Sequence, residues 1–276
     1  MSDHHHATGC QTGAAPDEAR APAMFANRRQ ALFATALGSL CAYALVREAR
    51  AQDRVTDRRL TAKRWIDRQE ELARGLQSGA VSAIAWHDEV DRMAGELDIT
   101  QFLAEVRASR ITPTSPPFMR DPVKRNIDFL DDQGRPRRLT YAAATFSFGP
   151  ENVITPHAHK HMASAHMVID GRVRIRTFDR LADRGDALLI RPSGDRVHGV
   201  GEAAAMTTAA DNIHWFTPAS QRAITFDVIV TDLDPGQASY VIQPVDPLAG
   251  QHQADGSILA PILSFETSMQ HYSAHV

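Results

Sequence analysis

The sequence has 276 residues, which is enough for one domain of ordinary size with further segments at its ends. Its 30 Lys and Arg residues stand against 33 Asp and Glu residues, for a net charge of -3. This balance argues against a nucleic-acid-binding protein, whose signature is a strong basic excess. The two cysteines are Cys10 and Cys41, so neither disulfides nor cysteine metal sites are expected to hold the fold.

Residues 1–51 are predicted to be an export signal. Arg28 and Arg29 form a pair, an uncharged run rich in Ala, Leu and Gly extends from Gln30 to Val46, and a small-x-small end closes at Ala51. This order is typical of a bacterial twin-arginine signal that is cleaved after Ala51. An uncleaved anchor is the alternative, but the uncharged run is shorter than the roughly 20 residues of a membrane span. We therefore expect a periplasmic protein with no stable membrane anchor.

Residues 52–110 are predicted to form a helical extension. Apolar residues recur there at three- and four-residue spacing among charged ones, which is the period of amphipathic helices. These residues are Trp65, Leu72, Leu76, Val81, Ile84 and Met93. A break is expected at Ser78-Gly79, and Asp98 is expected to cap the last helix. We expect these helices to serve packing or a dimer contact, with His87 at the surface.

Residues 111–122 contain four prolines and are predicted to be an extended linker. The apolar period then changes to two, and many short strands at regular spacing indicate an all-β sandwich or barrel over residues 123–250. Residues 251–276 form a C-terminal segment. Strands are expected at 126–130, 138–148, 164–170, 172–178, 187–191, 212–216 and 223–231, with a turn at 192–195.

Histidines gather in the first half of this β region. His157, His159, His161 and His166 fall within ten residues. Residues two apart on a strand face the same way, so His157 and His159 can both point into a barrel. Two inward imidazoles repel each other when protonated, and a shared cation removes that repulsion. The pair therefore predicts a metal site, and the alternative interpretation is a solvated, histidine-rich turn.

The pair, followed by a strand that ends in Val-Ile-Asp-Gly at 168–171, resembles the first cupin motif. The resemblance implies an all-β fold, the cupin double-stranded β-helix barrel, behind the N-terminal helical extension. That motif normally places a glutamate seven residues before the glycine, and here the position is Ser164. Without this carboxylate the resemblance implies a three-histidine site. His166 faces the same side as Ser164, so it could substitute as a fourth ligand or line the pocket.

Two histidines compete for the third ligand position. The ordinary second cupin motif points to His198, although its spacing is one residue too long. The other candidate is His214 in Asp-Asn-Ile-His at 211–214, with Asp227 thirteen residues later. This segment resembles the thiol dioxygenases that act on cysteamine and on the N-terminal cysteine of proteins. One extra residue on a strand turns the following side chains to the opposite face, which favours His214 unless a bulge restores His198.

The resemblance covers residues 150–246 and implies iron(II) held by His157, His159 and His214. Imidazole also suits copper, nickel and zinc, so ligand type alone does not choose the metal. Three neutral imidazoles on one face of the ion would leave positions for a substrate thiolate and for dioxygen. The sequence thus predicts an exported iron-dependent dioxygenase with a small thiol and O2 as its partners and no nucleic acid.

The same resemblance implies catalytic roles for two further residues. Asp227 could accept a hydrogen bond from a metal ligand or from a substrate amine, as carboxylates beside metal sites do. The catalytic tyrosine of the family is matched to Tyr240. Two other functions fit the sequence: a non-oxygenase cupin that uses zinc, manganese or nickel, and a catalytically silent binding or sensor module.

Overall fold

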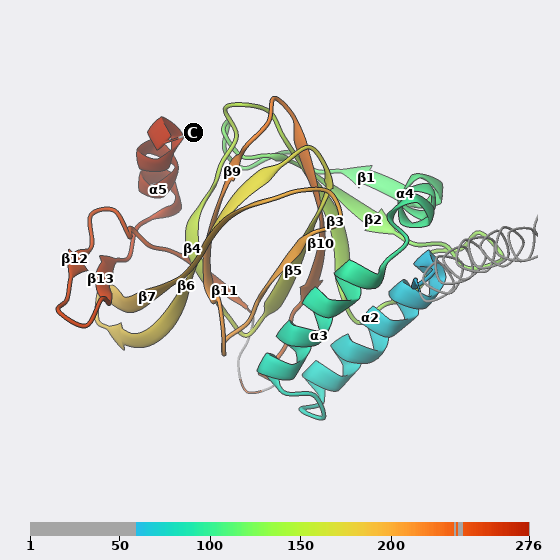
Figure 1. Cartoon of the computed structure of the whole chain (residues 1–276), viewed down its shortest axis with the longest axis horizontal. Helices are drawn as coiled ribbons and strands as arrows, with labels where there is room; N and C mark the ends of the chain where they lie inside the picture. Colours follow the sequence, from blue (N-terminus) through green and yellow to red (C-terminus); the bar gives the residue numbers. More distant parts are fainter. Residues whose placement is uncertain (1–58, 235, 237–239, 276) are drawn as a thin grey trace, which may run out of the picture. The chain divides into compact units, whose positions relative to one another are not determined.

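The computed structural model describes residues 59–234, 236 and 240–275, and the predicted export signal lies outside this part of the chain. The described residues begin with three helices, continue as a set of short strands and end in a C-terminal helix (Figure 1). Within these residues no helix has the length and apolar character that crossing a membrane requires.

The helices of the N-terminal extension are α2 (Ala62–Gln77), α3 (Ala83–Glu96) and α4 (Ile99–Ala108). The predicted break is confirmed, because Ser78 caps α2 and Gly79 follows with a φ of 74°. Such a positive φ suits a residue without a Cβ atom. The predicted cap at Asp98 is also confirmed. Its carboxylate accepts hydrogen bonds of 3.1 Å from the backbone N–H groups of Thr100 and Gln101.

The strands form two antiparallel sheets that face each other (Figure 1). One sheet has the order β1-β2-β3-β10-β5-β8 and the other β11-β4-β9-β6-β7-β13-β12. The strands are β1 (Arg110–Pro113), β2 (Val123–Asp128), β3 (Ala142–Phe148), β4 (Ile154–Lys160), β5 (Ala163–Asp170), β6 (Val173–Arg184), β7 (Ala187–His198), β8 (Ala203–Met206), β9 (Ile213–Pro218), β10 (Ala223–Val230), β11 (Val241–Pro244), β12 (Gln251–His252) and β13 (Ile258–Pro261). The two sheets form a double-stranded β-helix barrel, which confirms the predicted all-β fold class.

The chain passes from one sheet to the other at Gly171, between β5 and β6. Its φ is 67°, and a Cβ atom at this position would lie 2.0 Å from the carbonyl oxygen of Arg222. Any larger residue would therefore force the two backbone segments apart. This close approach accounts for the glycine of the predicted motif.

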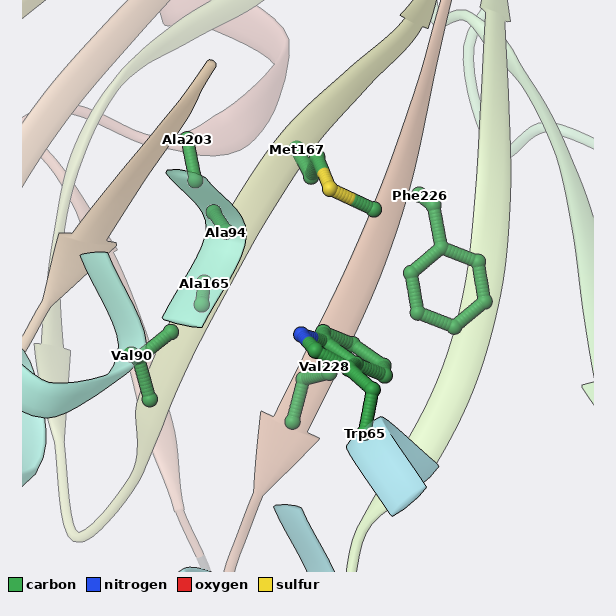
Figure 2. Close-up of a pocket in the computed structure, with 8 residues that line it drawn as sticks. All are labelled: Trp65, Val90, Ala94, Ala165, Met167, Ala203, Phe226 and Val228. Carbon is green, nitrogen blue, oxygen red and sulfur yellow. The ribbon is translucent and has the colours of Figure 1, made fainter. Parts of the chain in front are cut away.

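The helices cover the outer face of the sheet that contains β5 and β10. Side chains alternate along β10, so that Asp227 lines the interior cavity while Phe226 and Val228 face the helices. Figure 2 shows this layer, with Trp65 of α2 and Val90 of α3 opposite residues of β5, β8 and β10. The extension thus packs on the barrel, as predicted. The inner face of the same strands lines the cavity.

Aromatic rings form the centre of this layer. The ring of Phe102, on α4, lies 4.9 Å from that of Trp65 and 4.8 Å from that of Phe226, both in edge-on geometry. Such pairs add stability beyond the area they bury. Ile84 departs from the predicted apolar pattern, because it is 47% exposed.

The prediction for His87 is wrong, because this residue of α3 is half-buried against the loop before β9. Its Nε2 lies 3.1 Å from Asp211 Oδ2 and its Nδ1 lies 3.1 Å from Asp88 Oδ1. The hydrogen bond to Asp211 raises the pKa of His87 to about 9. The ring is therefore charged at neutral pH and links the helices to the barrel.

The strands depart from the predicted boundaries at both ends of the barrel. β1 lies in the segment predicted as a linker, and β12 and β13 lie in the C-terminal segment, where β13 pairs with β7. β7 also continues through residues 192–195, which were predicted as a turn. Beyond Ile190 its outer side is not paired with β13, so Pro192, which lacks an N–H group, is tolerated there. The pattern of turn residues misled the prediction at this edge.

Candidate metal centre

Three histidines meet inside the barrel. His157 and His159 lie two residues apart on β4, and His214 lies on the adjacent strand β9, directly opposite His157. One ring nitrogen from each of the three lies within 4.8 Å of the others. The structure thus brings together the three residues that the sequence singles out, and such a group could hold one divalent metal.

The rings have the orientation and the protonation state that metal ligands require. The Nδ1 of His157 lies 2.8 Å from the carbonyl oxygen of Thr155, to which it donates, and this leaves its Nε2 unprotonated. That Nε2 lies 3.1 Å from the Nε2 of His159. Desolvation inside the barrel lowers the pKa of His157 to about 4 and holds the pKa values of His159 and His214 well below the usual range. All three rings are therefore neutral at pH 7, with lone pairs available for a cation.

A buried amide fixes the segment that precedes His214. Asn212 donates hydrogen bonds from its Nδ2 to the carbonyl oxygens of His159, at 2.9 Å, and of Thr207, at 3.1 Å. One bond holds the loop between β8 and β9 closed, and the other ties this loop to the strand of the histidine pair. The asparagine of the Asn-Ile-His segment therefore positions His214 relative to His159.

Beside the three histidines lies a chain of hydrogen bonds that the sequence analysis did not predict. The Oδ2 of Asp227 lies 2.6 Å from His166 Nδ1, and His166 Nε2 lies 3.0 Å from the hydroxyl of Ser164. All three residues are buried and line the same cavity. Both ring nitrogens of His166 are thus engaged, so His166 lines the pocket and is not the fourth ligand. Asp227 contacts His166, whereas its predicted partner was a metal ligand or a substrate amine.

His198 and His161 lie away from the group. The sheet order β4-β9-β6-β7 places His198 three strands from the histidine pair, and its Nε2 lies 3.1 Å from Arg196. The register shifts between Thr177 and Phe178, which is the bulge that absorbs the extra residue. His198 therefore returns to the face of its partner Val173, but at a different place in the barrel. His161 lies in the turn between β4 and β5.

The three histidines line a cavity of about 610 Å³. Its walls come from both sheets, from the segment before β2 and from α5 (Phe265–Tyr272). Tyr240, the second predicted catalytic residue, also lines this cavity and is 46% exposed. The cavity thus joins the candidate metal centre, Asp227 and Tyr240 in one space that a small organic molecule can occupy.

No protein-family model matches the sequence, and no curated protein matches it. Among solved structures, an oxalate oxidase is 17% identical over 43% of this chain and 55% of its own, with a TM-score of 0.31. Procruciferin, an 11S globulin from Brassica napus, is 13% identical over 47% and 28%, with a TM-score of 0.32. A protein with a double-stranded β-helix domain from Klebsiella pneumoniae is 16% identical over 46% and 88%, with a TM-score of 0.29. The chain thus spans about half of the oxalate oxidase chain, and these likenesses concern the fold alone.

Proposed function

We propose that this protein is an exported, iron-dependent cupin dioxygenase that oxidises a thiol with O2. Both oxygen atoms would be added to the sulfur, so that the thiol becomes a sulfinic acid and no other reductant is needed. The observation that carries the proposal is the cluster of His157, His159 and His214 at the cavity wall, with Ser164 where the cupin motif has its glutamate. A site of three neutral ligands leaves more positions open for substrate and O2 than a site with a fourth protein ligand.

The residues around the cluster supply the remaining parts of this reaction. Iron(II), when bound, would supply the activation of O2. In the tautomer with Nδ1 protonated, His166 donates to Asp227, and its Nε2 then accepts from the Ser164 hydroxyl. This chain can take up a proton that leaves the thiol. Tyr240 is proposed to contact the substrate from the cavity wall.

The export part of the proposal rests on the sequence of residues 1–51. The paired arginines, the uncharged run and the small residues near Ala51 support it. A protein that folds and takes up its metal before export would suit a pathway that carries folded proteins.

The test is a metal-loading series. Protein of residues 52–276 is loaded without air with iron(II), zinc, manganese or nickel, and O2 uptake is measured with cysteamine and with peptides that begin with cysteine. We expect uptake only in the iron-loaded protein, with one O2 consumed per thiol and a sulfinate as product. Absence of uptake with every thiol in iron-loaded protein would refute the proposal.

A second function is favoured by one observation, the hydrogen-bonded chain of Ser164, His166 and Asp227. Such a chain is a proton-transfer device that does not depend on O2. It fits a hydrolase or isomerase that uses zinc, manganese or nickel to polarise a substrate. The same loading series separates the two functions, because a hydrolase or isomerase is expected to show no O2 uptake when it is loaded with iron.

A further inference from the structure

The cavity is large for a small thiol. At about 610 Å³ it lies within the range of pockets that enclose ligands of drug size. Apolar side chains form much of its wall, among them Phe146 and Ile154 of the barrel and Pro116 and Pro117 of the segment before β2. A two- or three-carbon thiol would leave most of this wall in contact with water. The shape and composition of the wall therefore fit a ligand with an apolar body.

Part of the wall is built by α5, whose C-terminal end is fixed by contacts with the barrel. The hydroxyl of Tyr272 donates a 2.7 Å hydrogen bond to Asp246, and its ring lies 5.0 Å from that of Trp215. Phe265, the first residue of this short helix, and Met269, in its middle, line the cavity. Phe265 is 47% exposed, so part of its ring is open to a molecule in the cavity.

One lysine stands out at this cavity. The sequence has three lysines, and two of them form ion pairs: Lys63 with Asp132 at 3.3 Å and Lys160 with Asp183 at 3.0 Å. The third, Lys124, is half-buried, lines the cavity and is in no ion pair with any described residue. Its Nζ lies over the ring of Phe146, 5.8 Å from the centroid.

A half-buried ammonium group in an apolar wall, without a carboxylate partner, is a ready binding point for an anion. The nearest acidic residue along the chain in this wall is Asp121, and its carboxylate already accepts a 3.0 Å hydrogen bond from Phe118 N–H.

Lys124 and Asp227 line the cavity at different places on the same sheet. Lys124 is on β2, which is two strands away from β10, the strand of Asp227. Strands lie about 4.8 Å apart, so the two residues are on the order of 10 Å apart across the sheet. The three histidines lie on β4 and β9 of the facing sheet, so Lys124 is separate from the candidate metal centre.

We propose that the cavity binds thiols that carry an apolar body and an anionic group, with the anion on Lys124 and the body between α5 and the proline-rich segment. The thiol part of this proposal rests on the proposed function, whereas the anion and the apolar body rest on the cavity itself.

The anion is tested by binding without turnover. The metal-loaded protein is titrated in the absence of O2 with 4-(sulfanylmethyl)benzoate and with the uncharged 4-(sulfanylmethyl)benzamide. We expect the carboxylate to bind about tenfold more tightly. Lys124→Gln is expected to remove this preference, and Lys63→Gln, which changes an exposed lysine outside the cavity, is expected to keep it. Equal affinities in the unmodified protein, or equal effects of the two substitutions, would overturn the proposal.

The apolar body is tested with a second matched pair. Phe265→Ala is expected to weaken binding of the benzoate several-fold and to leave binding of 3-sulfanylpropionate unchanged. Leu248→Ala is the control, because Leu248 is 50% exposed and lies outside the cavity wall. Both residues are exposed, so neither change threatens the fold. Loss of affinity for both probes, or for neither, in Phe265→Ala would contradict a role in holding the apolar body.

These binding results are separate from the proposed reaction. Preferential binding of the benzoate without O2 uptake by the iron-loaded protein would support the ligand class and refute the oxidation. O2 uptake with cysteamine without any preference for the benzoate would support the oxidation and refute the ligand class.

Discussion

His166 and Asp227 lie directly opposite each other on β5 and β10 and share a buried hydrogen bond of 2.6 Å. The carboxylate is fully buried, and its other oxygen, Oδ1, has no hydrogen-bond partner among the described residues. Asp227 therefore acts on the imidazole of His166 and through it on the hydroxyl of Ser164. This places Asp227 in the hydrogen-bonded chain beside the three histidines and outside the group that could bind the metal.

Asp227→Asn is expected to lower turnover about 10–100-fold while metal content stays near one per chain. The neutral amide can present either its oxygen or its NH2 group to Nδ1, so it fixes the tautomer of His166 less firmly than the carboxylate does. Turnover and metal content are measured on the same preparation, with Asp195→Asn, an exposed residue, as the control. Loss of both metal and fold in Asp227→Asn would show that its role is structural.

Phe102→Ala is expected to lower the free energy of unfolding by about 3–5 kcal/mol, because it empties the centre of the aromatic layer between the helices and the barrel. Urea unfolding measures this change. Ile84→Ala, at a residue that is 47% exposed, is expected to change stability by less than about 0.5 kcal/mol. A similarly small effect of Phe102→Ala would mean that the helices do not stabilise the barrel.

His87 makes stability depend on pH. Its pKa is raised to about 9 in the folded protein, above the value near 6.5 of the unfolded chain. Its contribution is therefore fully present below about pH 6.5 and is lost as the pH rises through about 9. We expect His87→Gln to destabilise the protein by about 1.5–3 kcal/mol at pH 6, the range of hydrogen bonds to charged groups, and by much less at pH 10. An equal loss at both pH values would contradict a charged His87.

Replacing Arg28 and Arg29 with Lys is expected to leave the protein in the cytoplasm, because the export receptor reads the paired guanidinium groups. Cell fractionation with an antibody against the barrel measures the distribution, and the unmodified protein is the control. Mature protein in the periplasm, cleaved after Ala51, in the double variant would refute twin-arginine export.

Much of the candidate site could be predicted because it depends on local spacing. His157 and His159 share a face of one strand, and that follows from the period of two alone. The choice of His214 over His198 needed a family resemblance, because no local rule says which strand lies beside β4. The spacing argument against His198 was insufficient. The bulge in β7 absorbs the extra residue and returns the side chain of His198 to the face it would have without that residue.

The remaining features depend on pairings between distant segments. His166 and Asp227 are 61 residues apart, and only the register between β5 and β10 brings them together. Lys124 and α5 reach the cavity in the same way, from segments outside the motifs. His87 lies on an amphipathic helix whose pattern predicts a surface position, and its partner Asp211 is 124 residues away. Such contacts have no signal in a single sequence.

We propose that His157, His159 and His214 together hold one metal ion. The direct measurement is the metal content of purified residues 52–276 and of the alanine variants at His157, His214 and His198. We expect about one ion per chain in the unmodified protein and in His198→Ala, and little or none in His157→Ala and His214→Ala. Full metal content in His214→Ala together with loss of metal in His198→Ala would contradict the claim.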